Sequence, residues 1–599
     1  MRFHCLGVGS IGSLFATNLA SLPSTQVRLI LRRKDLANQL LDASSPRPRA
    51  DSASASATPY GSLTVERDGI ARRVSNLELE LTRSPADSFD TTSLSGGSSS
   101  RPSPRIDPRL WNRNDPIETL VVTTKAPQTL PALRQLLPRL SSRSTIVLCQ
   151  NGMGVLEGLL AKYWPEDRSD EIEAQDEAAG GTGGRGRWGS MGGRPSFVCA
   201  TTTHGAWRKG GAHFVHAGMG DVKFGVVPNR AVLSTISSYP NPRWESPANN
   251  PLLNPRSLVQ PTLDHLPYTP STASLHTTLS SLLSLNELAP SWLPLPTLQI
   301  AQLQKLAVNA SVNSLTALIG VNNGAFVGSQ KAKRVIETVC QECSLVFAAH
   351  LAREEGTWAP PPPPETSSSA SADDDDDLSA DLSSLSFSSH PPPPPLPSSH
   401  PLSPYSLLDY TQRVLFKTSS NISSTLSDLL PLQNPHTFSL SENAPSLPSR
   451  TEIEYINGYV VALGRRYGIQ TTTVKALGEL VLLKEEMGRV GAVDRMWASQ
   501  RRGRSASPSP SSSPSTSSSQ PSRSSAASSS PSLFRSSPRS PSPSRSSPPP
   551  SSASASSNPQ QRAHDRARNH AELRRDNEER AHGQRGERIR GERDREGGG

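Results

Sequence analysis

Residues 2–12 read RFHCLGVGSIG, and this stretch decides the fold. The apolar run at 2–6 predicts a β-strand, and the glycine-rich turn at 7–12 then opens a stretch that predicts a helix ending before Pro23. A GxGxxG turn in this context suits a dinucleotide. Its first glycine permits a tight turn, the second lets the backbone approach a pyrophosphate, and the third lets the helix pack on the strand. The unpaired N–H groups at the helix N-terminus would face the anion.

The next expected strand, VRLIL at 27–31, ends where an NAD site would carry an acidic residue for the ribose hydroxyls. Arg32 and Arg33 stand there instead. A carboxylate at this place would repel a 2′-phosphate, whereas a guanidinium group can hold it through charge-assisted hydrogen bonds. The two residues favour NADP(H) over NAD(H). The alternative is a pair of exposed arginines that merely end a strand.

Two further expected strands end in polar residues. TLVVTTK at 119–125 ends in Lys125, and TIVLCQNG at 145–152 ends around Asn151. The carboxyl ends of strands in a doubly wound parallel sheet border the ligand crevice, so both side chains are candidates for contact with a cofactor or substrate. Each could equally be a simple strand terminus.

Composition limits how much of the chain can fold. With 34% hydrophobic and 5% aromatic residues and 55 prolines, 599 residues are too lean for four packed domains, and about two are expected. We predict a nucleotide-binding domain at 1–227, a low-complexity linker at 228–290, a mostly α-helical substrate domain at 291–498 and a disordered Ser/Arg/Pro-rich tail at 499–599. Disordered inserts are expected at about 42–60, 83–105, 165–194, 355–404 and 429–449.

The net charge of +9 belongs to the tail, because residues 501–599 hold 18 Arg against 9 Asp and Glu. The remaining core is neutral, so no nucleic acid is expected there. The tail could be solubilising, phosphorylated or RNA-associating. No stretch reaches the roughly 18 consecutive apolar residues of a membrane span. Folded sequence starts at Arg2, leaving no room for a cleavable presequence, and five scattered cysteines indicate a reducing compartment, so a cytoplasmic rather than mitochondrial location is expected.

A polar stripe marks the second domain. Within the helical pattern at 298–324, Lys305, Asn309 and Asn313 recur every four residues, each turned about 40° from the last. A buried amine and two amides need hydrogen-bond partners, which a polar ligand would supply. An internal hydrogen-bond network is the alternative.

A last block, TEIEYINGYVVALGRRYGI at 451–469, places Glu452 near a helix start, downstream of the short polar run NISS at 421–424. An acid there could simply favour the helix dipole. Together with the polar run, however, Glu452 suggests a site.

These motifs occur in an order that resembles the ketopantoate reductase family. They are GVGSIG at 7–12, the Lys125 strand end, QNGMG at 150–154, TTTHGA at 201–206, KLAVNxxxN at 305–313, NISS at 421–424 and TEIEYINGY at 451–459. The resemblance covers residues 1 to about 490 and misses the inserts. One departure is the long spacing from Asp428 to Thr451, which could disturb how Ser424 and Glu452 meet.

The resemblance implies a role for each matching residue. Cofactor contacts would come from Gly7, Val8, Gly9, Ser10, Ile11, Gly12, Arg32, Lys125, Asn151, Ala206 and Glu452. Lys305 would be the catalytic general acid, with Glu452 near it, and the substrate would meet Lys305, Asn309, Asn313, Asn323 and Ser424. No metal is expected.

The resemblance also implies NADPH-dependent reduction of ketopantoate to (R)-pantoate, a step in pantothenate and coenzyme A biosynthesis. Hydride would reach the 2-keto carbon while the Lys305 ammonium protonates the developing alkoxide. Two alternatives stay open: reduction of another branched 2-oxoacid, and a catalytically idle NADP-binding scaffold whose tail recruits a partner or RNA. The sequence does not determine the oligomeric state, and a homodimer stays open.

Overall fold

The computed structural model describes residues 1–42, 60–82, 114–165, 193–239, 249–358, 393–433 and 450–505. These residues belong to one compact unit, Met1–Ser509. The expected insert at 83–105 and the tail beyond 505 lie outside the described residues, as do most of the other expected inserts.

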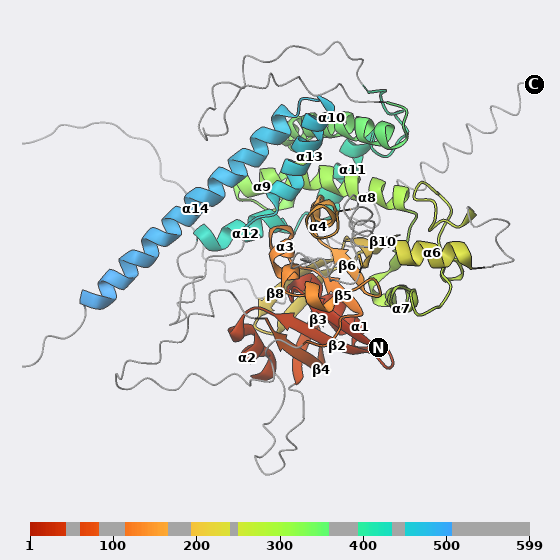
Figure 1. The fold of residues 1–599 in the computed structure, drawn as a ribbon. Helices are drawn as coiled ribbons and strands as arrows, with labels where there is room; N and C mark the ends of the chain where they lie inside the picture. Colours follow the sequence, from red (N-terminus) through yellow and green to blue (C-terminus); the bar gives the residue numbers. More distant parts are fainter. Residues whose placement is uncertain are drawn as a thin grey trace, which may run out of the picture. The chain divides into compact units, whose positions relative to one another are not determined.

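The N-terminal domain is built on a single mixed sheet with helices on both faces (Figure 1). Its described strands lie in the order β11-β10-β7-β6-β5-β1-β2-β4-β3-β9-β8. They are β1 (Arg2–Leu6), β2 (Gln26–Leu31), β3 (Tyr60–Arg67), β4 (Ile70–Leu81), β5 (Thr119–Val122), β6 (Thr145–Cys149), β7 (Ser196–Thr202), β8 (Gly205–Gly210), β9 (His213–Gly218), β10 (Val222–Val227) and β11 (Pro290–Trp292). The segment from β2 through β1, β5 and β6 to β7 is parallel throughout, as the Rossmann-like expectation requires.

Side chains alternate between the two faces of the parallel strands, so each face has its own core. One face is covered by α1 (Ser10–Leu19), α2 (Lys34–Asp42), α6 (Arg230–Ser238) and α7 (Ala273–Leu283). The other is covered by α3 (Ala126–Arg134) and α4 (Val155–Tyr163). This arrangement on both faces confirms the doubly wound fold.

The sheet curls at its far edge. β7 and β8 stand at distant places in the strand order, yet only two residues, Thr203 and His204, separate them in the chain. The β8–β9 hairpin must therefore fold back toward the end of β7. It also packs against α1, the helix that follows the glycine turn.

The linker predicted at 228–290 is wrong for most of its length. α6 and α7 form there and bury Val232, Ile236, Leu275 and Leu279 against the sheet. The many serines and threonines of this region are typical of a low-complexity linker. On α7, however, their hydroxyls donate to carbonyls one turn earlier in the helix, as Thr277 does to Ala273 at 2.7 Å. The leucines alone carried the helical signal. The first domain therefore extends to β11 rather than ending at 227.

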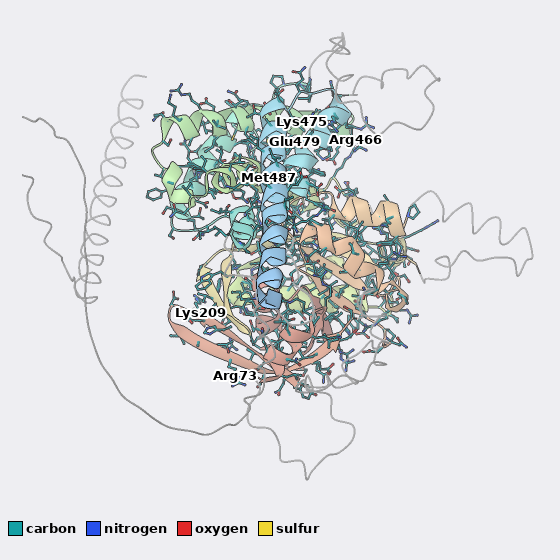
Figure 2. The ribbon with its side chains drawn as sticks, turned by 90° about the vertical axis from the view of Figure 1, so that its left-hand side faces the viewer. Arg73, Lys209, Arg466, Lys475, Glu479 and Met487 are labelled. Atoms are coloured by element: carbon teal, nitrogen blue, oxygen red, sulfur yellow. The ribbon has the colours of Figure 1, made fainter. Side chains whose placement is uncertain are left out.

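The second domain is helical, as predicted. Its elements are α8 (Leu295–Val308), a π-helical turn (Asn309–Asn313), α9 (Ser314–Ile319), a 3₁₀ turn (Asn323–Phe326), α10 (Gln330–Glu354), α11 (Pro404–Lys417), α12 (Ser424–Gln433), α13 (Ile453–Tyr467) and α14 (Thr472–Ser505). Figure 2 shows α14 with Lys475, Glu479 and Met487 along it. Three expected boundaries move: Leu402 is buried within the insert predicted at 355–404, α12 runs past 429, and α14 runs past 498.

Helix α10 is the centre of this second core. Val339, Val346 and Phe347 are fully buried, and so are Cys340 and Cys343, whose thiols are free. Among the described residues, α10 is also the one helix long and apolar enough to cross a membrane, but 56% of the apolar window is buried inside the protein. A core helix passes the same test, so α10 is weak evidence for a membrane span.

A buried ion network ties the strands together at the edge opposite the glycine turn. Arg28 on β2, with 1% of its side chain exposed, donates from Nε to Glu78 at 2.8 Å and from Nη1 to Asp115 at 2.6 Å. Arg139 donates to Glu80 at 2.5 Å. Removing one member of such a network leaves its partners charged and buried without compensation.

Replacing Arg28 with alanine should lower the free energy of unfolding by about 3–5 kcal/mol, because Glu78 and Asp115 lose their closest cation and keep only the longer pairs with Arg2 and Arg139. Urea unfolding followed by circular dichroism measures the change. Arg67→Ala is the matched control, since Arg67 lies on β3 in an exposed pair with Asp68 and should cost at most about 1 kcal/mol. Equal losses in the two variants would contradict a special contribution from the buried network.

Candidate functional site

The glycine turn has the geometry that a bound pyrophosphate needs. Gly7 has a φ of +98°, and a Cβ there would collide with the backbone of Thr124. A Cβ on Gly12 would collide with the Gly7 carbonyl oxygen and the Thr123 hydroxyl. At Gly9, by contrast, a Cβ would meet nothing within 4 Å, so this side of the turn is open. α1 begins at Ser10, and its N-cap residue Gly9 has no side chain to cap it, which leaves the first N–H groups of the helix available to an anion.

Lys125 and Asn151 lie together at the carboxyl edge of the sheet, and Glu452 of the second domain joins them. The Glu452 carboxylate accepts a hydrogen bond from the backbone N–H of Ala126 at 3.1 Å and from Asn151 Nδ2 at 3.4 Å. Ala126 is the first residue of α3, so the Glu452 carboxylate accepts a hydrogen bond at the N-terminus of a helix in the other domain. Burial raises the pKa of Glu452, and the Ala126 N–H and the Lys125 ammonium oppose that shift.

A second carboxylate pairs with Lys125 across the same junction. Asp428 on α12 accepts a hydrogen bond from Lys125 Nζ, and most of the Asp428 side chain is buried. Burial raises the pKa of Asp428 to about 6, with Lys125 opposing the rise. Sequence reasoning missed Asp428. A signal was present, because Asp428 follows Ser424 by four residues and therefore lies on the same face of the helix.

Lys305 reaches this edge from α8. Its Nζ donates to the backbone carbonyl of Thr202 at 2.8 Å. Burial lowers the pKa of Lys305, while negative charge at Cys149, Glu452 and Asp221 opposes that shift. The Cys149 thiol is itself buried with its pKa raised to about 11, so it is neutral at pH 7 and the Glu452 and Asp221 carboxylates are the groups that oppose the lowering.

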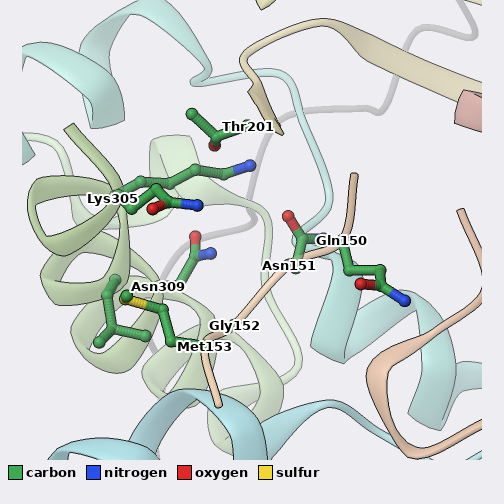
Figure 3. Close-up of a pocket in the computed structure, with 9 residues that line it drawn as sticks. Gln150, Asn151, Gly152, Met153, Thr201, Lys305 and Asn309 are labelled. Carbon is green, nitrogen blue, oxygen red and sulfur yellow. The ribbon is translucent and has the colours of Figure 1, made fainter. Parts of the chain in front are cut away.

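A pocket opens between Lys305 and the end of β6. Its lining residues are Gln150, Asn151, Gly152, Met153, Thr201, Gln302, Lys305, Leu306 and Asn309. Figure 3 shows the Lys305 amine and the Asn309 amide extending from the helix toward the loop that carries Asn151. Among the described residues the Asn309 side chain has no hydrogen-bond partner, so an internal network does not account for it. The polar part of this pocket can receive a ligand with its own donors and acceptors.

The remaining predicted substrate residues form a neighbouring polar cluster outside the pocket lining. Asn313 Nδ2 donates to Ser424 Oγ at 3.4 Å, and Asn323 Nδ2 donates to Thr418 Oγ1 at 2.9 Å. The Asn323 Oδ1 is buried without a donor. Ser423, the neighbour of Ser424, bonds the Leu426 N–H at the start of α12, which leaves the Ser424 hydroxyl free for a further partner.

Arg32 and Ala206 lie outside the pocket, in two different parts of the first domain. Arg32 is exposed at the end of β2 and forms no ion pair within the described part of the chain, and Ala206 lies on β8 opposite His216. Neither residue lines the pocket. The long spacing between Asp428 and Thr451 does not separate the two halves of the site, since Asp428 and Glu452 both reach the edge that holds Lys125 and Asn151.

Comparison with known proteins agrees with this architecture. Residues 75–229 match the family model of ketopantoate reductase PanE/ApbA, and residues 297–435 and 446–485 match the model of its C-terminal domain. The chain is 26% identical to the probable 2-dehydropantoate 2-reductase of Schizosaccharomyces pombe over 81% of this chain and 96% of that protein. It is 23% identical to the 2-dehydropantoate 2-reductase of Saccharomyces cerevisiae over 64% and 77%.

Among solved structures, D-mandelate dehydrogenase with NADH and anilino(oxo)acetate aligns with a TM-score of 0.46 and 15% identity. The alignment covers 82% of this chain and 100% of that one.

The open side of the glycine turn yields a paired test. Gly9→Ala should change the free energy of unfolding by no more than about 1 kcal/mol, because φ is −88° and the added methyl meets nothing, yet it should weaken dinucleotide binding. Gly12→Ala should instead destabilise the fold by about 1–3 kcal/mol through overpacking. Urea unfolding and titration of intrinsic fluorescence measure both effects. Unchanged dinucleotide affinity in Gly9→Ala would mean that the ligand does not approach this turn.

Proposed function

Because the chain belongs to the ketopantoate reductase family of oxidoreductases, we propose that it reduces 2-dehydropantoate to (R)-pantoate with NADPH. The observation that carries the proposal is the partly buried Lys305 ammonium in a pocket with Asn151 and Asn309, at the edge of the sheet where the glycine turn lies. The pocket combines a proton donor with hydrogen-bonding amides that can hold a keto acid.

The residues of the glycine turn and the sheet edge fit a nicotinamide dinucleotide. The uncapped start of α1 and the open side of Gly9 suit its pyrophosphate, and Asn151 stands at the pocket end of the same edge. Arg32, exposed and without an acidic partner in the described residues, favours a 2′-phosphate and hence NADPH. When bound, this cofactor supplies the hydride.

Lys305 supplies the proton. As hydride reaches the keto carbon, negative charge develops on the keto oxygen, and a fixed ammonium stabilises that charge more than it stabilises the neutral ketone. The Thr202 carbonyl takes one N–H of Lys305 and sets the direction of the side chain, which leaves its other protons for the substrate. Proton donation by a positioned acid contributes on the order of a hundredfold or more to the rate.

The neighbouring polar cluster suits the other end of the substrate. Ser424 begins α12, so its hydroxyl and the adjacent N–H groups can receive a carboxylate. The buried Asn323 Oδ1 lacks a donor, and a substrate hydroxyl would supply one. 2-Dehydropantoate carries such a hydroxyl beside its two methyl groups, whereas 3,3-dimethyl-2-oxobutanoate has the same branched 2-oxoacid frame without it. The unpaired oxygen therefore favours 2-dehydropantoate over the other branched 2-oxoacids.

Steady-state oxidation of NADPH with a panel of 2-oxoacids tests the proposal. We expect 2-dehydropantoate to give the highest kcat/KM, exceeding 3,3-dimethyl-2-oxobutanoate by about tenfold or more because Asn323 would lose its donor. Lys305→Ala should lower kcat by about a hundredfold or more, while Lys475→Ala on the outer face of α14 should leave it unchanged. A chain that bound NADPH and reduced no 2-oxoacid would be an idle scaffold, and the proposal would fail.

The pH dependence of kcat should report the charge of Glu452. Lys305 must be protonated to act as an acid, so kcat should fall as the pH rises through the pKa of Lys305. Glu452 opposes the lowering of that pKa, so Glu452→Gln should move the alkaline limb of the profile to lower pH. Glu479→Gln on α14 is the matched control and should leave the profile unmoved. An unmoved limb in Glu452→Gln at saturating cofactor would show that Glu452 does not support the ammonium.

A further inference from the structure

Arg208 reaches the glycine turn from a distant part of the chain. It lies on β8, and its Nη2 donates to the backbone carbonyl of Val8 at 2.9 Å. Its guanidinium group also lies over the ring of Phe214 on β9, 5.0 Å from the ring centroid. The curl of the sheet makes both contacts, because it carries the β8–β9 hairpin over the start of α1. Arg208 is thus fixed in place beside the second residue of the GxGxxG turn.

Arg208 forms no ion pair with a carboxylate within the described residues, so none of their carboxylates neutralises it directly. Burial lowers its pKa, and the positive charge of Arg33 lowers it further, with Asp35 opposing. Asp35 itself pairs with Arg33 at 3.6 Å. Since an arginine stays charged at neutral pH, Arg208 and Arg33 concentrate positive charge here, and Arg32, which forms no ion pair within the described residues, directly precedes Arg33.

The position of Arg208 and Arg33 indicates which anion they would bind. The pyrophosphate of a dinucleotide belongs at the N-terminus of α1, and the adenosine ribose belongs at the end of β2. Arg208 contacts Val8, at the start of the turn, and the β8–β9 turn lies beside α2, which follows Arg33 directly, since a Cβ on Gly211 would lie 3.5 Å from Gln39 Oε1. It therefore lies on the ribose side of the turn. One guanidinium N–H donates to the Val8 carbonyl, and the other N–H groups can donate hydrogen bonds to a phosphate.

From these contacts we propose that Arg208 binds the 2′-phosphate of NADPH from the opposite side to Arg32 and helps the enzyme to discriminate NADPH from NADH. The proposal rests on the function above only in taking NADPH as the cofactor. No turnover is needed to test it, because ligands with and without the 2′-phosphate can be compared by binding alone.

Dissociation constants for NADPH, NADH, 2′,5′-ADP and 5′-AMP, measured by calorimetry on the full chain, test the role. Arg208→Ala should weaken NADPH and 2′,5′-ADP by about tenfold to a hundredfold and leave NADH and 5′-AMP nearly unchanged. Arg208→Lys should recover part of the loss, because a lysine keeps the charge but not the fork of donors. Lys209→Ala is the matched control, since Lys209 is the next residue of β8 and pairs with Glu66 at 2.7 Å (Figure 2).

Four outcomes would overturn the inference. Equal losses for all four ligands would place Arg208 on the pyrophosphate, or in the folding of the hairpin. Unchanged affinities in Arg208→Ala would remove it from the site. A wild-type chain that binds NADH as tightly as NADPH would overturn the proposed cofactor as well, whereas a wild-type preference for NADPH that survives in Arg208→Ala would overturn the role of Arg208 alone.

Discussion

The carboxylate of Glu452 is the contact on which the arrangement of the site depends. It comes from the helical domain, yet it accepts from the first N–H of α3 and from Asn151, both in the sheet domain. A buried carboxylate is costly unless it is hydrogen-bonded, so this position is favourable only while the two domains are in contact. Asp428 adds a second such tie through Lys125. Together these contacts hold the strand ends of one domain against the Lys305 helix of the other.

The same junction explains why Lys305 can remain an acid although it is partly buried. Desolvation disfavours its ammonium form, and the Glu452 and Asp221 carboxylates favour it. The Glu452 carboxylate that joins the two domains thus also raises the pKa of Lys305, the group proposed to donate the proton. At the glycine turn the curl of the sheet has a comparable effect, because it carries a guanidinium group from β8 to the backbone of Val8.

Local patterns in the sequence predicted much of this structure. The glycine turn, the parallel strands and the buried face of α13, with Ile453, Ile456 and Val460, follow from short-range periodicity, and the structure confirms them. The region 228–290 was misread because serines and threonines that bond back to their own helix look like linker. The sequence also placed Lys305, Asn309 and Asn151 in a site, and they line one pocket. Their roles in binding and catalysis stay predictions.

Other features could not be predicted, because they depend on contacts between distant residues. Arg28 meets Glu78 and Asp115 at separations of 50 and 87 residues, and Arg208 meets Val8 at a separation of 200. No local periodicity reports such pairs. The division of the predicted substrate residues into a pocket and a neighbouring cluster likewise depends on how α12 docks on α9.

The transfer of label from NADPH deuterated at C4 of the nicotinamide tests the central claim most directly. The purified chain would be incubated with this cofactor and 2-dehydropantoate, and the product examined by mass spectrometry and proton NMR. The account predicts pantoate with deuterium at C2 from the wild-type chain, and almost none from Lys305→Ala over the same time. Tight binding of NADPH without transfer of deuterium to 2-dehydropantoate would contradict it.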